Sequence, residues 1–212
     1  MNIAIIGASG KAGNLIMKES LDRGHNVTAI VRNASKITNE KVHVVEKDIL
    51  ALTTTDLAPF DVVVNAFGSV PGQEKQHIEA GKVLIEALKG APHTRLLVVG
   101  GAGSLFVDPE KTIRLVDTTE FPAAYEPLAR SQGENLQDLL AAEGISWTFL
   151  SPAAFFNPEG RRTGAYQAGK DHVITNSEGQ SYISYADYAI ALVDEIEKPQ
   201  HVNQRFTVVA EA

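Results

Sequence analysis

The sequence predicts an α/β protein built on a doubly wound parallel sheet, Rossmann-like, with a small substrate lobe near the C-terminus. Short apolar runs alternate with longer amphipathic stretches along most of the 212 residues. The runs are aliphatic or β-branched with little polar alternation, which is typical of strands buried on both faces. A glycine-rich turn, Gly7–Gly13, follows the first run directly. Strands and helices in this order imply right-handed crossovers between parallel strands.

Six apolar runs are the predicted strands. They are Ile3–Ile6, Val27–Val31, Val42–Val45, Val62–Val64, Leu96–Val99 and Trp147–Leu150. The first predicted helix follows the glycine-rich turn, reaches about Arg23 and closes at Gly24. A glycine just beyond the last helical residue is a common helix stop because it adopts the left-handed conformation without strain.

Three further helices are predicted from apolar residues at helical spacing. One contains Ile78, Ile85 and Leu88 and stops at Gly90, and another has a leucine stripe at 136–140. The last begins at Ser184 in a Ser-x-x-Asp capping box and ends before Pro199.

One segment, residues 151–181, breaks this rhythm. It is rich in proline and glycine and offers only a brief strand candidate, His172–Thr175. Long irregular segments inside compact domains are often binding loops or lids. We therefore expect a single domain over residues 1–212, in which 151–181 is a substrate-side lobe; whether it moves as a lid stays open.

Composition excludes several classes of protein. The chain has no cysteine, so thiolate catalysis, disulfides and cysteine-based metal sites are excluded. A net charge of −7 argues against broad binding to a nucleic-acid backbone. No apolar run is long enough for a membrane span, and the N-terminus lacks the basic region of a signal peptide. The six histidines lack metal spacing, so no metal is expected. We expect a cytoplasmic protein, monomeric or homodimeric, with no nucleic-acid or membrane partner.

The strongest chemical signal is the turn Gly7-Ala8-Ser9-Gly10-Lys11-Ala12-Gly13, set between a predicted strand and a predicted helix. A pyrophosphate needs backbone N–H groups at close range and the positive end of a helix dipole. Gly7 permits the tight turn, Gly10 lets the backbone approach the phosphate, and Gly13 lets helix and strand pack closely. The spacing Gly-x-x-Gly-x-x-Gly differs from Gly-x-Gly-x-x-Gly, but the context is the required one.

Cofactor choice is expected at the end of the second strand. A site that selects NAD carries an acid there for the ribose 2′-hydroxyl. This chain has Val31-Arg32-Asn33 instead, and Lys36 lies one helical turn further on. Arg32 can pair with a 2′-phosphate as a charge-assisted fork, so the sequence predicts NADP(H) in preference to NAD(H).

Motifs after each strand resemble one family. The phosphate turn and Arg32 are followed by Asp48-Ile49, Asn65–Gly68, Gly100–Ser104 and Trp147–Pro152. Together they resemble the atypical short-chain dehydrogenase/reductases, and within them the NmrA-like NAD(P)-binding proteins. The likeness is greatest to the NADH-flavin reductases and more distant to biliverdin-IXβ/flavin reductase. It covers nearly the whole chain and is more specific for fold and cofactor than for substrate.

The resemblance implies a set of cofactor contacts. Phosphates would be held by Ser9, Gly10, Lys11 and Ala12, and the adenosine end would meet Arg32, Asp48 and Ile49. Ala66, Phe67 and Gly68 would run beside the ribose and pyrophosphate, and Gly101 to Ser104 with Pro152 to Phe155 would flank the nicotinamide.

The usual proton donor of alcohol-specific short-chain dehydrogenases, Tyr-x-x-x-Lys, is missing. Four residues after Tyr125 stands Ala129, and Arg130 is one step out of register. Pro127 is expected to disturb the first turn of this helix further. Tyr125 and Ser104 remain candidate catalytic donors, but the catalytic residues are not identified.

Flavin reduction makes a weaker demand, because hydride passes directly to the ring and alignment carries much of the acceleration. We expect FMN, FAD or riboflavin as a substrate and not as a prosthetic group. Phe155 and Phe156 are expected to wall the acceptor, with Ser104 and Arg161 as possible polar contacts. The tyrosines at 182, 185 and 188 are expected to be packing residues.

Three functions stay open at this point. The first is an NAD(P)H-dependent reductase of a flavin or similar planar conjugated acceptor. The second is an NADP(H)-binding regulator or redox sensor with little or no turnover, which the missing Tyr/Lys pair also fits. The third is a sugar epimerase or dehydratase, for which the small lobe leaves little room.

Overall fold

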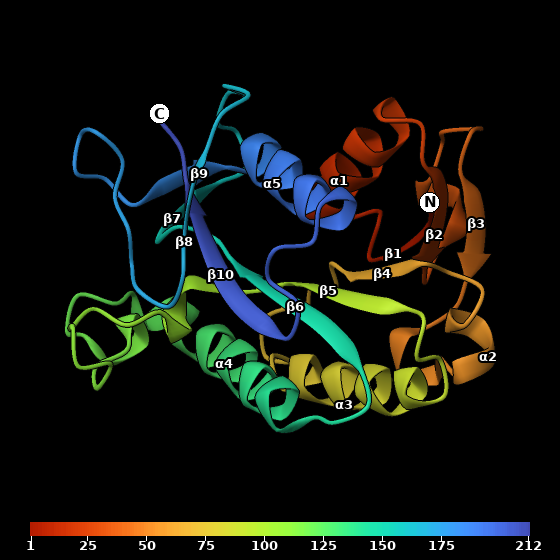
Figure 1. The fold of residues 1–212 in the computed structure, drawn as a ribbon, viewed down its shortest axis with the longest axis horizontal. Coiled ribbons are helices and arrows are strands. Elements are labelled where there is room, and N and C mark those ends of the chain that lie inside the picture. The colour runs from red at the N-terminus through yellow and green to blue at the C-terminus, as the bar shows by residue number, and fades with distance from the viewer.

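The computed structural model describes all residues from 1 to 212, and its centre is an eight-stranded sheet in the order β3-β2-β1-β4-β5-β6-β10-β8 (Figure 1). All neighbours pair in parallel except β8, which runs antiparallel to β10. These strands are β1 (Asn2–Ile6), β2 (Asn26–Val31), β3 (His43–Glu46), β4 (Val62–Asn65), β5 (Arg95–Val99), β6 (Ser146–Ser151), β8 (Gln167–Gly169) and β10 (Gln204–Val209). A separate small sheet pairs β7 (Phe155–Asn157) with β9 (Tyr182–Ser184) in parallel.

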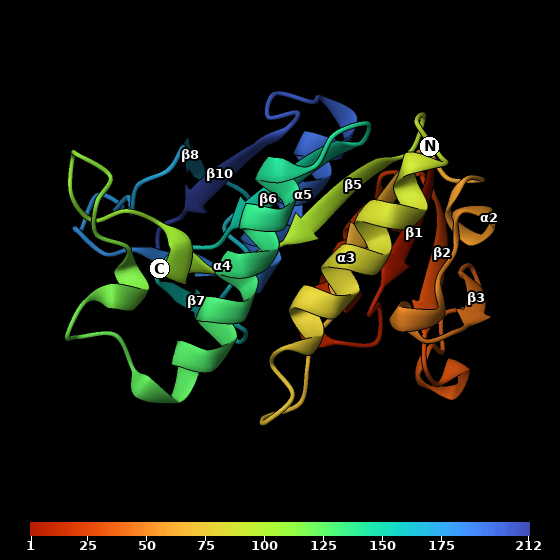
Figure 2. The same ribbon diagram turned by 90° about the horizontal axis from the view of Figure 1, so that it is seen from below.

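Helices cover both faces of the large sheet. On one face, α1 (Lys11–Asp22) packs beside α5 (Tyr185–Glu197), and on the other α3 (Gln76–Lys89) packs beside α4 (Glu126–Ala141) (Figures 1 and 2). The short α2 (Thr54–Leu57) lies against α3. This is the predicted doubly wound, Rossmann-like α/β fold. None of the helices combines the length and the apolar character needed to cross a membrane.

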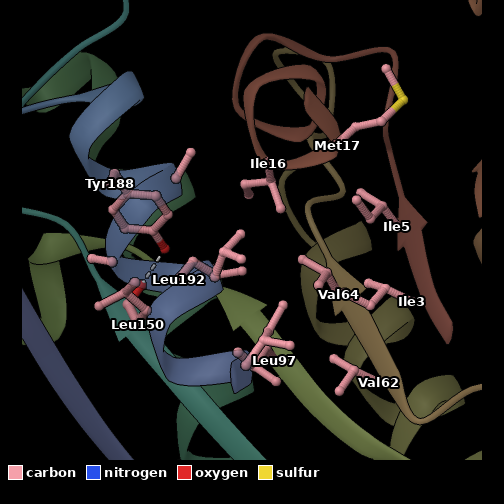
Figure 3. Close-up of a cluster of buried hydrophobic side chains, with 14 of the residues drawn as sticks. Ile3, Ile5, Ile16, Met17, Val62, Val64, Leu97, Leu150, Tyr188 and Leu192 are labelled. Carbon is pink, nitrogen blue, oxygen red and sulfur yellow. Dashed lines mark hydrogen bonds between the residues drawn. The ribbon is translucent and has the colours of Figure 1, made fainter. Parts of the chain in front are cut away.

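The pleat of the strands divides the core into two halves. Successive side chains of a strand point to opposite faces, so Ile3 and Ile5 of β1 pack toward α1 and α5 while Ala4 packs toward α3 and α4. Figure 3 shows the first half, where Ile16 of α1 approaches β1 and β4. Tyr188 of α5 is fully buried there and donates a hydrogen bond to the carbonyl of Leu150 at 2.7 Å. The buried hydroxyl is thereby satisfied.

The six predicted strands are confirmed, each to within two residues at either end, but β10 and the short strands β7, β8 and β9 were not predicted. β10 is buried along most of its length, yet Arg205 and Thr207 interrupt its apolar residues. The Arg205 guanidinium is accepted at that depth because it donates to Asp171 Oδ1 at 2.9 Å and to Ser104 Oγ at 3.2 Å. Because the charged Arg205 interrupts the apolar residues of β10, the sequence alone does not indicate this strand.

The prediction of a strand at His172–Thr175 is wrong. His172 forms only an isolated bridge to Phe106, and the strand of this segment is β8, which precedes it. Helix ends are better predicted: Gly24, with a φ of +81°, follows Arg23, the residue that caps α1. The Ser184 hydroxyl accepts the N–H of Asp187 as a helix cap.

Segment 151–181 is fastened to the helices of one face. Arg162 forms an ion pair with Glu19 of α1, and the Tyr166 hydroxyl donates to Asp194 of α5 at 2.9 Å. The fully buried carboxylate of Asp187 accepts the N–H groups of Thr163 and Gly164, both at 2.9 Å. The capping-box carboxylate expected to return to Ser184 therefore holds the loop instead.

Candidate functional site

A cleft of about 930 Å³ opens at the carboxyl ends of the parallel strands. It spans the point where β1 lies between β2 and β4, so the chain order of the sheet reverses there. Ligands of open α/β sheets lie in such a crevice. Among the predicted cofactor residues, those that line it are Gly7, Ser9, Gly10, Lys11, Ala12, Arg32, Ile49, Ala66, Phe67, Gly68, Gly101 and Pro152. Gly13 and Asp48 do not line it.

Two glycines of the phosphate turn, Gly7 and Gly13, have no room for a side chain. Gly7 has a φ of +76°, and a Cβ on it would lie 2.5 Å from the carbonyl oxygen of Ala66. A Cβ on Gly13 would lie 2.3 Å from the carbonyl oxygen of Gly7, so this glycine acts beneath the cleft by close packing. Gly10 precedes α1 without a side-chain cap, which leaves the first N–H groups of the helix for an anion. These residues fit a dinucleotide pyrophosphate.

The end of the cleft predicted to hold the 2′-phosphate carries two positively charged side chains without an ion-pair partner. Arg32 and Lys36 both line the cleft, and neither forms an ion pair within the chain. Lys47 lines it too, although its ammonium pairs with Asp56 at 2.7 Å. Asp48 accepts the N–H of Leu50 at 2.8 Å and caps a short turn, while Ile49 beside it lines the cleft.

His77, to which the sequence assigns no role, supports the loop after β4. His77 of α3 lines the cleft, is 8% exposed, and meets the edge of Phe67 with ring centroids 5.2 Å apart. Its Nε2 accepts the N–H of Ser69 at 3.4 Å, which requires an unprotonated nitrogen. Burial lowers the pKa of His77 to about 4, and Glu74 opposes this shift. Ser69 and His77 are eight residues apart, and the conformation of the loop between them decides whether they meet.

Stability should therefore depend on pH through His77. The folded-state pKa lies below the unfolded value of 6.5, so this contribution is present above pH 6.5 and is lost as pH falls to about 4. The expected loss is about 3 kcal/mol. Urea unfolding at several pH values measures it. His77→Gln, which does not titrate, should flatten the profile in that window; parallel profiles for the two proteins would contradict this assignment.

The other half of the cleft lining, formed by residues from Gly100 onward, contains glycines and several aromatic and apolar side chains. Gly100 and Gly101 follow β5, and a Cβ on Gly100 would lie 2.1 Å from the ring of Phe149. Phe155 and Phe156 also line the cleft, and Phe156 packs on Tyr185 with ring centroids 3.9 Å apart. Further lining residues are Phe121, Pro122, Tyr125, Leu128, Gln132 and Pro158. Such a wall suits a planar conjugated ring.

Tyr125 lies at the mouth of this half, 64% exposed, in the residue before α4. The expected disturbance by Pro127 is wrong: it is the second residue of α4, where no helical acceptor awaits its missing N–H. Arg130 does not turn toward Tyr125 but pairs with Glu126 at 2.8 Å and Asp117 at 3.0 Å. No Tyr/Lys pair is presented by this helix.

Two predicted substrate contacts lie outside the cleft. Ser104 is buried, accepts from Arg205, and lines a separate cavity of about 250 Å³. Arg161 donates to the backbone oxygen of Ala212 at 3.1 Å. Both expectations are corrected, because the 3₁₀ turn after Gly101 points Ser104 toward β10 and the lobe directs Arg161 to the C-terminus. No three acidic or histidine side chains gather as a metal site.

Comparison with known proteins identifies the class. The chain matches the NAD(P)H-binding family over residues 7–199 and belongs to it. The fold is thus that of an NAD(P)H-binding, reductase-like protein.

Individual relatives add detail. YwnB of Bacillus subtilis, an uncharacterized protein, is 67% identical over the full length of both chains. A Streptococcus pneumoniae protein described as a "putative NADH-flavin reductase" is 44% identical, with each chain fully covered and a TM-score of 0.94. A Bacteroides thetaiotaomicron protein described as a "putative epimerase" is 38% identical, covering 100% of this chain and 98% of that one, at a TM-score of 0.89. Proteins described as a reductase and as an epimerase share this fold, so the activity has to be inferred from the residues of the cleft.

Proposed function

We propose that this protein is an NAD(P)H-dependent reductase that transfers hydride to a flavin or a similar planar conjugated acceptor. One observation carries the proposal: the cleft joins a glycine cradle for a pyrophosphate to a half walled by aromatic rings, in which α4 offers no Tyr/Lys pair. This wall favours alignment of two flat rings over binding of a polyhydroxylated sugar. The similar Streptococcus pneumoniae protein supports the same reading by its description.

The chain's contribution is binding and orientation. Bound NADPH supplies the hydride. The uncapped N–H groups at the start of α1 and the ammonium of Lys11 would hold the pyrophosphate. Gly100 and Gly101 line the cleft after β5, where the nicotinamide would lie, and Phe156 would limit where an acceptor ring can lie. Holding the two rings in contact accelerates the reaction by proximity and excludes water from between them.

A steady-state assay tests the proposal. Purified protein should oxidise NADPH when FMN or riboflavin is added, and NADPH binding should be confirmed separately by fluorescence titration. Binding without turnover on flavins, quinones or tetrapyrroles would contradict the reductase and favour a regulator.

The preference for NADP(H) rests on Arg32. Arg32→Ala should raise the dissociation constant of NADPH by about 10- to 100-fold, because a charge-assisted pair with the 2′-phosphate is worth about 1.5–3 kcal/mol. The dissociation constant of NADH should change less than about threefold. Lys41→Ala is the matched control, since it removes one exposed positive charge outside the cleft. Equal losses for NADPH and NADH would refute the role of Arg32.

A further inference from the structure

The cavity of about 250 Å³ that Ser104 lines has no part in the proposed reaction. It lies between one face of α4 and residues 102–117, which fold back along that helix (Figure 2). Ala129 lines both this cavity and the cleft, and a Cβ on Gly103 of the cleft would lie 2.6 Å from the Cβ of Ala129. These two residues are therefore in close contact where the cavity and the cleft adjoin.

Ser104 brings a buried hydroxyl to the cavity. The residue is 7% exposed, and its oxygen accepts a hydrogen bond from Nη1 of Arg205 at 3.2 Å. Arg205 is itself buried and neutralised by Asp171, which accepts from its Nε at 2.9 Å. The hydrogen of the Ser104 hydroxyl has no acceptor in the chain, so this group can donate to a ligand. A buried donor without an acceptor costs free energy that a bound acceptor would recover.

Two arginines line the same cavity. Arg114 is half-buried and forms no ion pair within the chain. Arg130 donates from Nε to Glu126 at 2.8 Å and from Nη1 to Asp117 at 3.0 Å, which fixes its guanidinium and leaves Nη2 free. The planar fork of a guanidinium matches the paired oxygens of a carboxylate or a phosphate. The donors of this cavity are therefore suited to an oxyanion.

The other lining residues discriminate among oxyanions. Glu134 is an exposed carboxylate of α4 that forms no ion pair, and its charge opposes a doubly charged ligand more than a singly charged one. Val116 and Ala129 are apolar and give a short hydrocarbon chain a surface to pack against. A ligand with one negative charge and a small apolar part satisfies both conditions.

We propose that this cavity binds a small monocarboxylic acid in its ionised form. The carboxylate would accept hydrogen bonds from the Ser104 hydroxyl and the Arg114 guanidinium, with the free Nη2 of Arg130 as a further donor. The hydrocarbon part would lie against Val116 and Ala129. This ligand is held without any chemical change, and it is distinct from the cofactor and the hydride acceptor.

Calorimetric titration of the full-length protein with butyrate tests the proposal. We expect saturable binding at one site per chain. Butyramide, which has a similar size but no charge, should bind at least about tenfold more weakly, because it loses the charge-assisted hydrogen bonds. With NADPH present to fill the phosphate turn, inorganic phosphate should bind more weakly than butyrate, because of Glu134 and because it lacks an apolar part.

Arg114→Gln should raise the dissociation constant of butyrate about tenfold, the effect of one lost charge-assisted hydrogen bond. Arg161→Gln is the matched control. It removes an exposed guanidinium that lines neither the cavity nor the cleft, so the dissociation constant should stay within about twofold of the wild-type value. Thermal unfolding checks that both variants are folded, and the comparison of butyrate with butyramide decides the question on wild-type protein alone.

Butyrate should still bind when NADPH is present, because the cavity is separate from the cleft. Competition between the two would overturn the proposal by placing the carboxylate in the cleft. Equal affinities for butyrate and butyramide, an unchanged affinity in folded Arg114→Gln, or tighter binding of phosphate than of butyrate would also overturn it. None of these measurements depends on hydride transfer, so the proposed function stands or falls separately.

Discussion

Replacing Gly13 with alanine should weaken NADPH binding at least about 100-fold. The added Cβ would lie 2.3 Å from the carbonyl oxygen of Gly7, a backbone atom that cannot rotate away. Relief requires α1 to move from β1, which displaces the N–H groups at the start of the helix from the pyrophosphate. Losing two charge-assisted hydrogen bonds at about 1.5 kcal/mol each accounts for this factor. Fluorescence titration of the purified variant with NADPH measures it.

Gly133→Ala is the control for this variant. Gly133 lies inside α4, and a Cβ there meets only the Cβ of Ser104, at the ordinary distance of 3.8 Å. The substitution should leave NADPH binding unchanged and stabilise the fold by up to about 1 kcal/mol. Wild-type affinity in Gly13→Ala, with native circular dichroism, would show that the turn is not the pyrophosphate site.

The second large effect is expected from Asp187→Ala. The carboxylate is fully buried and accepts the N–H groups of Thr163 and Gly164 together with the Thr163 hydroxyl, at 2.8 to 2.9 Å for the shortest contact with each. Its removal breaks three hydrogen bonds to a charged group, so we expect a loss of about 4 kcal/mol in the free energy of unfolding. Chemical denaturation measures that loss. Protease cleavage within segment 151–181 should accelerate, because one of its two anchors on α5 is gone while the bond from Tyr166 to Asp194 remains.

Asp22→Ala is the matched control. Asp22 is an exposed carboxylate at the end of α1, and its side chain makes no hydrogen bond or ion pair. Its loss should change stability by less than about 0.5 kcal/mol. An equally small loss for Asp187→Ala would show that the loop is held by Arg162 and Tyr166 without it.

Most strands of the large sheet and the glycine-rich turn of the cleft could be predicted from the sequence, because each is encoded in a short continuous stretch of residues. A buried parallel strand is a short apolar run, and a phosphate turn is a few glycines between a strand and a helix. Gly7 and Gly10 therefore stand in the cleft where their spacing placed them. The missed strand β10 lacked such a signal, since Arg205 is neutralised by Asp171, which is distant in sequence.

The half of the cleft proposed to hold the acceptor could not be predicted as well, because contacts between residues distant in sequence form it. His77 and Tyr185 belong to helices that the sequence does predict, but only packing turns these side chains toward the cleft. Ser104 was misjudged for the same reason: its chain position fits a nicotinamide contact, while its hydroxyl satisfies a buried arginine. Helical spacing alone cannot distinguish a residue that faces a cleft from one that faces the core.

The central claim is that this cleft moves hydride from a reduced nicotinamide to a planar ring. Anaerobic rapid mixing of the purified protein with NADPH and FMN tests it directly, by following the absorbance of both. We predict that one FMN is reduced for each NADPH oxidised, and that deuterium at the transferred position of the nicotinamide slows the step. NADPH that binds tightly but stays reduced in the presence of FMN and of other planar acceptors would contradict the account.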